Sequence, residues 1–219
     1  MRLPNRHPAA LAILLLLIGA PAVTQAQAPS GTATGASAGP GTPVGSAPAT
    51  PDTLDQLMQL LAARRHGHVT FTEEQHLAVL ERPLESSGEL LYEAPDRLEK
   101  RTLRPRGETL VLSRGVLSAT RAGRTRVVEL AAWPQLAPLL ESIRATLAGD
   151  RASLERVFEV HLDGELGEWT LELVPRDAAA AGLVKQVRIQ GQQARLRTVD
   201  ILHSDGDRSR LTIGAELAP

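Results

Sequence analysis

Residues 158–174, FEVHLDGELGEWTLELV, alternate apolar and polar side chains in two runs that are separated by turn residues. The apolar positions are Phe158, Val160 and Leu162 in the first run and Trp169, Leu171 and Leu173 in the second. A period of two places these side chains on one face of a β-strand and the polar ones on the other. The stretch predicts two antiparallel strands, joined by a turn at Asp163-Gly164, with one apolar and one solvated face.

The alternation continues toward the C-terminus. Val187 and Ile189 flank Arg188, and Val199 and Ile201 flank Asp200. A turn at Asp205-Gly206 precedes the last apolar set, which is Leu211, Ile213, Ala215 and Leu217. This part of the chain therefore predicts further strands of the same antiparallel meander.

Toward the N-terminus, leucines recur at helical spacing over residues 134–147, with Gly149 placed to end the helix. A short helical piece is expected over 153–156, and a second amphipathic helix over 52–63, ended by a His66-Gly67-His68 loop. Short strands separated by turn residues are expected between them, at 69–72, 88–93, 97–103, 109–113, 116–120 and 125–130.

Roughly nine or more strands in one sheet must curl, and two long helices cover little of its apolar face. The predicted fold is α+β and mainly antiparallel β, an incomplete, half-open β-barrel with a helical lid. Its concave apolar surface could hold a hydrophobic ligand. The candidate lipid-binding residues are Leu90, Tyr92, Leu110, Leu112, Leu139, Ile143, Phe158, Val160, Trp169, Leu171, Val187, Ile189 and Ile213. An ordinary closed core is the alternative for this apolar face.

The first residues predict export. Arg2 and Arg6 precede an apolar run over 9–19, and Thr24-Gln25-Ala26 offers small residues for cleavage, which is typical of a signal peptide over 1–26. The apolar run is about half the length of a membrane span, which argues against an anchor. Residues 27–51 are almost entirely Ala, Gly, Pro, Ser and Thr and predict a disordered linker, followed by one domain over 52–219. We expect a periplasmic protein; the chain has no cysteine for acylation or a disulfide.

Composition argues against several other functions. With a net charge of −1, the chain lacks the positive electrostatic potential that attracts nucleic acid. The sequence contains no phosphate-binding loop, no G-x-S-x-G motif and no H-E-x-x-H motif. His66 and His68 alone make a weak metal site, and Asp205-Gly206-Asp207 fits a hairpin better than a calcium loop. Glu73-Glu74, the pair Glu165 and Glu168, and the dispersed His76, His161 and His203 are expected on solvated faces; Ser113 and Ser118 have no recognisable base. We expect no enzyme activity, no cofactor and no metal.

The order of elements resembles the LolA-like periplasmic lipoprotein carriers. Two segments carry the likeness: VTFTEEQHLAVLERPLESSGELLYEAPDRLEKRTLRPRGETLVLSRGVLSAT (69–120) and LERVFEVHLDGELGEWTLELVPRD (154–177). The first is similar to the family's run of an early Phe, a Ser-Gly turn and a Pro-containing turn, and the second to a strand pair ending in Leu-x-Pro. The resemblance implies a half-open barrel whose sheet and lid hold acyl chains, without catalysis.

One position departs from that family. The turn at Ala94-Pro95 has Ala where the lipoprotein carriers usually have an Arg that hydrogen-bonds the lid and helps release cargo. The chain therefore resembles a divergent branch. We expect a monomeric carrier of a lipoprotein, glycolipid or other acylated cargo, working between an inner-membrane exporter and an outer-membrane acceptor. The alternative is a periplasmic sensor or binding module that contacts a membrane partner.

Overall fold

The computed structural model describes residues 51–132 and 137–217. The expected signal peptide and linker lie outside the described residues. The helices are α2 (Pro51–Ala62), the 3-10 turn η1 (Leu130–Ala132), α3 (Ala137–Ala148), α4 (Arg151–Val157) and α5 (Ala178–Ala181). The strands are β1 (His66–His76), β2 (Leu84–Glu93), β3 (Arg97–Arg104), β4 (Glu108–Ser113), β5 (Val116–Arg121), β6 (Arg124–Glu129), β7 (Phe158–Glu165), β8 (Glu168–Pro175), β9 (Val184–Gln192), β10 (Arg195–His203) and β11 (Arg208–Glu216).

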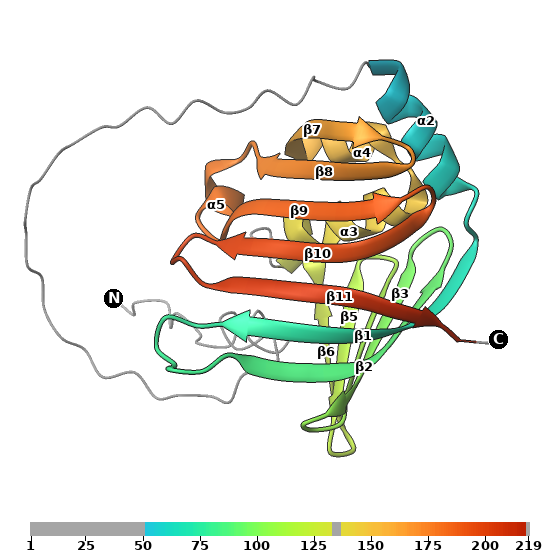
Figure 1. Cartoon of the computed structure of the whole chain (residues 1–219). Coiled ribbons are helices and arrows are strands. Elements are labelled where there is room, and N and C mark those ends of the chain that lie inside the picture. Colours follow the sequence, from blue (N-terminus) through green and yellow to red (C-terminus); the bar gives the residue numbers. More distant parts are fainter. Residues whose placement is uncertain (1–50, 133–136, 218–219) are drawn as a thin grey trace, which may run out of the picture.

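The strands form one eleven-stranded antiparallel sheet in the order β6-β5-β4-β3-β2-β1-β11-β10-β9-β8-β7 (Figure 1). Two meanders, β1–β6 and β7–β11, are joined where the first and last strands of the chain pair, with Phe71 opposite Ile213. The sheet remains open, with β6 and β7 as its edges. The predicted half-open, mainly antiparallel fold is thus confirmed.

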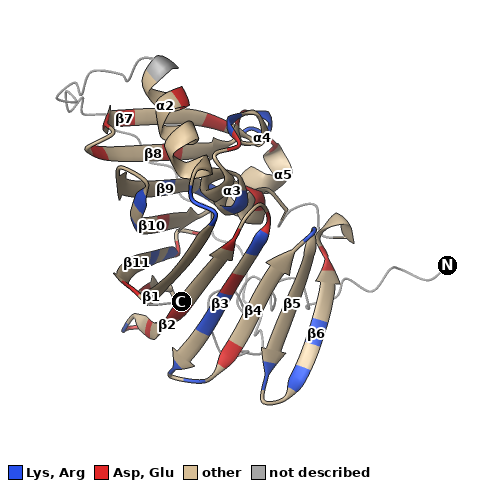
Figure 2. Ribbon diagram, turned by 90° about the vertical axis from the view of Figure 1, so that its right-hand side faces the viewer, with Lys and Arg blue, Asp and Glu red and all other residues tan. Residues whose placement is uncertain are grey.

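Helices α2, α3 and α4 pack together and stand over the β7–β10 half of the sheet, while β3–β6 extend beyond them (Figure 2). The amphipathic helix expected over 52–63 is present as α2, and its apolar stripe is buried in the main core, namely Leu54, Leu57, Met58 and Leu61. Gly149 ends α3 with a φ of 63°, a left-handed conformation that glycine adopts without strain. A Cβ at Gly149 would lie 2.0 Å from the Met58 carbonyl oxygen, so glycine also allows α2 and α3 to approach.

Two predicted turns are wrong in detail. The β7–β8 hairpin turns at residues 166–167, and Gly164 lies inside β7 opposite Trp169. A Cβ there would be 2.4 Å from the Glu168 carbonyl oxygen, so this glycine serves a close strand approach instead of a turn. The His66-Gly67-His68 segment belongs to β1, because its backbone completes the ladder with residues 91–93 of β2.

One short element escaped prediction. Helix α5 occupies the connection between β8 and β9, and the Asp177 side chain caps it by accepting a hydrogen bond from the Ala179 backbone N–H at 2.5 Å. Four alanines carry no apolar periodicity, so the capping aspartate was the available sequence signal. The leucine spacing predicts a long helix from residue 134; α3 spans Ala137–Ala148, and residues 133–136 lie outside the described part.

Candidate functional site

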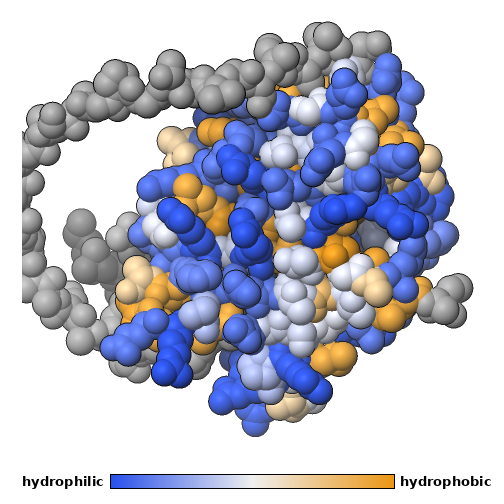
Figure 3. All heavy atoms as spheres, in the orientation of Figure 1, coloured by the Kyte–Doolittle hydropathy of each residue, from blue (hydrophilic) through white to orange (hydrophobic). Residues whose placement is uncertain are grey.

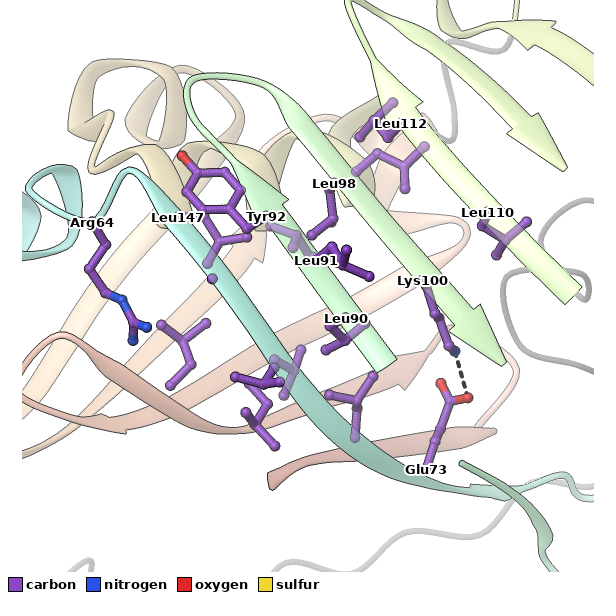
Figure 4. Close-up of a pocket in the computed structure, with 18 of the residues that line it drawn as sticks. Arg64, Glu73, Leu90, Leu91, Tyr92, Leu98, Lys100, Leu110, Leu112 and Leu147 are labelled. Atoms are coloured by element: carbon purple, nitrogen blue, oxygen red, sulfur yellow. Dashed lines mark hydrogen bonds and ion pairs between the residues drawn. The ribbon is translucent and has the colours of Figure 1, made fainter. Parts of the chain in front are cut away.

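An apolar cavity of about 270 Å³ lies between helix α3 and the concave face of the sheet. Its walls come from β1–β5 on one side, from β10 and β11 on the other, and from α2 and α3 above. Figure 4 shows leucines of β2, β3 and β4 along its length, with Tyr92, Leu147 and Arg64 at one end and Glu73 with Lys100 at the other. The volume is close to the lower end of the roughly 300–1,000 Å³ that small-molecule pockets span.

The candidate residues divide between this cavity and a closed core. The cavity is lined by Leu90, Tyr92, Leu110, Leu112, Leu139, Ile143 and Ile213. The remaining candidates lie in the packed core between the sheet and the helices, namely Phe158, Val160, Trp169, Leu171, Val187 and Ile189. Leu171 and Val187 have no exposed surface at all, so the candidates on β7–β9 lie in a closed core, whereas Ile213 of β11 lines the cavity.

Helix positions explain this division. The sequence shows that both meanders have one apolar face, and it does not show where the few helices stand. Helices α2, α3 and α4 pack together, and their side chains fill the concavity over β7–β9. Over β1–β5, α3 and the Leu61 end of α2 cover only part of the face, and the apolar side chains there border the cavity.

Several lining residues were not among the candidates. On the lid they are Leu61 of α2 and Leu140 and Leu147 of α3. On the sheet they include Val69, Leu98, Leu117, Leu196, Val199, Ile201 and Leu211. Strand alternation points to such positions where they share a face with a candidate: Leu98 lies opposite both Tyr92 and Leu112, and Leu211 lies two residues before Ile213 on β11.

One end of the cavity carries a buried ion pair. Lys100 Nζ lies 2.7 Å from Glu73 Oε2, and both side chains are largely buried. Ser86 Oγ donates to Glu73 Oε2 at 3.0 Å, Ser209 Oγ donates to Oε1 at 3.4 Å, and Lys100 Nζ lies 5.1 Å from the Phe71 ring centre. The expectation that Glu73 is solvated is wrong, because strand alternation from Phe71 turns Glu73 inward; Glu74 is exposed as expected.

His203 adds a second buried polar group at the cavity wall. It ends β10, is 5% exposed, and its Nε2 has no hydrogen-bond partner among the described residues. Burial lowers the pKa of His203, although nearby Asp205 and Asp207 act in the opposite direction. The expectation of a solvated position is wrong for His203 and correct for His76 and His161, which are exposed.

The opposite end of the cavity is bordered by Arg64 and Tyr92. Arg64 connects α2 to β1, and its guanidinium donates to Glu216 Oε1 at 3.0 Å and to the Ala194 carbonyl oxygen at 3.3 Å. The Tyr92 hydroxyl is buried beneath α3 without a hydrogen-bond partner among the described residues, and burial raises its pKa. Ala94 follows at the β2–β3 turn, where its backbone N–H donates to the Arg65 carbonyl oxygen at 2.8 Å. A methyl side chain at Ala94 has no group that could hydrogen-bond the lid.

The other polar motifs lie outside this cavity or on its rim. Glu165 and Glu168 face each other at the exposed end of the β7–β8 hairpin, and Ser113 and Ser118 lie on β4 and β5 away from the lining. His68 Nε2 lies 3.1 Å from Glu89 Oε2. In the described part of the chain, no group of three or more His, Cys, Asp or Glu side chains is arranged to hold a metal, and no helix has the length and hydropathy to cross a membrane.

The outer, convex face of the sheet is hydrophilic. Cross-strand ion pairs cover it, with Arg188 Nε 2.8 Å from Glu172 Oε1 and Arg210 Nε 2.6 Å from Asp200 Oδ1. Figure 3 views this face and shows charged and polar residues over most of it, with scattered apolar ones. The alternation of apolar and polar residues along the strands therefore separates a solvent-exposed convex face from the apolar concave face.

Comparison with known proteins gave one family match. The family model described as outer membrane lipoprotein carrier protein, LolA-like, matches residues 46–218. No curated protein matches the chain.

Solved structures show more distant similarity. A LolA superfamily protein from Nitrosomonas europaea is 11% identical, with 76% of this chain and 94% of that one covered and a TM-score of 0.41. A putative outer membrane lipoprotein-sorting protein domain from Vibrio parahaemolyticus is 10% identical, covering 76% and 92%, with a TM-score of 0.41. MucB in the Pseudomonas aeruginosa MucA/MucB complex is 17% identical, covering 76% of this chain and 59% of that one, with a TM-score of 0.42.

Proposed function

The chain belongs to the LolA-like family of outer membrane lipoprotein carrier proteins, and from this membership we propose that it is a periplasmic carrier of acylated cargo. The cargo is a lipoprotein, a glycolipid or another acylated molecule whose chain enters the cavity beneath α3 and is ferried toward the outer membrane. The protein performs no catalysis in this role. It takes its cargo from an inner-membrane exporter and passes it to an outer-membrane acceptor.

The single observation that carries the proposal is the aliphatic cavity of about 270 Å³ under a helical lid. Leu90, Leu110 and Leu112 form one wall, and Leu139 and Ile143 of α3 face it. Burying one acyl methylene contributes about 0.8 kcal/mol, so a chain of about fourteen carbons gains roughly 11 kcal/mol before association costs. After a cost at the lower end of the estimated 4–15 kcal/mol, a dissociation constant near the micromolar range follows.

Mass spectrometry of organic extracts from the purified protein tests the proposal. We expect acylated molecules in the wild-type extract, at up to one per protein. The Leu110→Trp variant places a larger side chain in the same cavity and should carry much less lipid while remaining folded. The matched control Leu103→Trp alters an exposed leucine on β3, 59% exposed, and should retain the lipid. Equal lipid in all three proteins, or none in the wild type under conditions that preserve the fold, contradicts the proposal.

The second candidate, a module that contacts a membrane partner, has its own structural support. Edge strand β6 is largely exposed, including Arg124, Arg126 and Val127, and an exposed sheet edge can accept a strand from another chain. A wild-type extract without lipid, together with capture of a membrane protein that is lost in the Val127→Pro variant, would favour this candidate over the carrier.

A further inference from the structure

The concave surface that forms the cavity wall continues past the helices to the edge strand β6. Residues directly opposite each other on neighbouring antiparallel strands point to the same face of a sheet. Leu110, which lines the cavity, lies opposite Ala119 of β5, and Ala119 lies opposite Arg126 of β6. Arg126 therefore points to the concave side of the sheet, the same side as the cavity wall.

Two more arginines lie beside Arg126. Arg121 of β5 lies opposite Arg124 of β6. Both share the concave face with Arg126, because strand residues two positions apart point to the same side. We call Arg121, Arg124 and Arg126 the basic platform. Glu108 of β4 lies opposite Arg121, so in this row and the next a single carboxyl group accompanies three guanidinium groups.

The basic platform differs from the arginines of the convex face. On that face, arginines are paired across strands, as Arg188 is with Glu172. In the described part of the chain, no ion pair or hydrogen bond holds a side chain of the basic platform. Like charges directly opposite each other, such as Arg121 and Arg124, destabilise a sheet. A bound anion removes that repulsion, so the basic platform is complementary to a negatively charged ligand group.

The basic platform is exposed and close to the cavity. Arg124 and Arg126 are exposed, and Figure 2 shows basic residues at the ends of β5 and β6 that lie away from the helices. Neighbouring strands of a sheet lie about 4.8 Å apart, so Arg126, two strands from Leu110, lies about 10 Å from the cavity wall. The polar part of a lipid whose chain lies in the cavity can therefore reach the basic platform along the concave face.

We propose that Arg121, Arg124 and Arg126 bind an anionic group, a phosphate or a carboxylate, on the polar part of the cargo. The guanidinium group binds both kinds of anion through two parallel hydrogen bonds, which favours these groups over uncharged ones. The inference rests on the proposed function, since it concerns a molecule whose chain occupies the cavity. It narrows the preferred cargo to acylated anions and excludes neutral acylglycerols.

Displacement of a pyrene-labelled monoacylglycerol from the full mature chain tests the proposal. The competitors share a palmitoyl chain and differ in charge: lysophosphatidate, palmitate and monopalmitoylglycerol, each below its micelle-forming concentration. At low ionic strength, we expect the better anionic competitor to bind about tenfold more tightly than the neutral one. The difference should shrink to about twofold in about 0.5 M sodium chloride, because salt screens exposed charges. The anion that binds more tightly identifies the preferred group as a phosphate or a carboxylate.

The Arg124→Gln/Arg126→Gln double variant removes two charges of the basic platform from an exposed edge strand, where folding depends little on the side chains. It should bind the neutral lipid within about twofold of the wild type and lose most of the preference for anions. Arg188→Gln/Arg210→Gln is the control with the same change in net charge on the convex face, and it should keep the preference.

The outcomes separate the two proposals. Equal affinity of the wild type for all three lipids overturns the anion site and leaves the carrier proposal standing. A preference that the platform variant keeps, or that the convex-face control loses, also overturns the anion site. Failure of the wild type to bind the probe at all overturns both proposals.

Two further arms distinguish the source of the anion. Inorganic phosphate at the same concentrations should leave the affinities unchanged, because it has no chain to occupy the cavity; if it removes the preference, the arginines bind free anions and the proposal fails. Sedimentation with phosphatidylglycerol vesicles covers a membrane surface. Vesicle binding that requires Arg124 and Arg126, without a preference among the three lipids, would also overturn the proposal.

Discussion

Truncating one leucine in the core and one in the cavity wall should have opposite effects on stability and binding. Leu171 of β8 has no exposed surface and packs between Leu162 and Ile189 on the neighbouring strands. Leu171→Ala removes a fully surrounded side chain and should lower the free energy of unfolding by about 2–5 kcal/mol. It should leave acyl binding nearly unchanged, because Leu171 does not line the cavity.

Leu90→Ala is the matched variant in the cavity wall. Leu90 of β2 is half-buried and borders the cavity between Val69 and Lys100. Its truncation removes about three carbons, roughly 2.4 kcal/mol if fully surrounded, and about half of that because one side already faces empty space. We expect a loss of about 1 kcal/mol in stability and acyl binding weakened by about three- to tenfold, as one wall of the chain's site is withdrawn.

Urea unfolding followed by circular dichroism gives the stability of both variants, and titration with a fluorescent acyl probe gives their affinity. If Leu171→Ala loses acyl binding while lowering the free energy of unfolding by less than about 1 kcal/mol, β8 lines the lipid site and the assignment of Leu171 to a closed core is wrong. If Leu90→Ala shows the full core penalty with unchanged binding, Leu90 does not line a lipid site.

Three further predictions concern other parts of the molecule. Lys100→Met leaves the Glu73 carboxylate buried with its serine partners alone. The free energy of unfolding, measured with urea, should fall by about 3 kcal/mol. A decrease below about 0.5 kcal/mol would mean that the Glu73–Lys100 pair is solvated. The folded-state pKa of His203 lies below its ordinary value of 6.5, so the stability that the neutral imidazole contributes is present above pH 6.5 and is lost as the pH falls. Between about pH 7 and about pH 5, the wild type should therefore lose more of its free energy of unfolding than His203→Phe does. Parallel curves of unfolding free energy against pH for the two proteins would contradict this. Signal peptidase should cut after Ala26, so N-terminal sequencing of exported protein should begin at Gln27, and a retained apolar segment would contradict the expectation.

The regular meanders were predictable because strand alternation is local. Phe158, Val160, Trp169 and Leu171 share one face in the structure as in the sequence, and the apolar stripe of α2 is buried as its spacing requires. The pairing of β1 with β11 joins residues about 140 positions apart, and no short-range pattern encodes it. The position of the helices over the sheet also depends on contacts between distant parts of the chain. The sequence therefore could not show that the helices would cover the apolar face of β7–β9 and leave a cavity over β1–β5.

The polar end of the cavity was the least predictable part. Glu73 lies two residues after Phe71, and the period of two indicated an inward side chain, yet a charged residue is expected on a solvated face unless its partner is known. That partner, Lys100, lies two strands away and reaches Glu73 across β2. His203 looked like one of several dispersed histidines, and its burial follows from the end of β10 lying against the Leu183 segment.

The position of a bound acyl chain distinguishes the cavity from the closed core as the lipid site. Isotope-filtered nuclear Overhauser measurements on methyl-labelled protein with an unlabelled acyl ligand report which side chains the chain touches. We expect contacts to methyl groups of Leu90, Leu110, Leu112 and Ile143, which line the cavity, and none to Leu171, Val187 and Ile189 in the closed core. Contacts to the core set, or a bound ligand that contacts neither set, would contradict it.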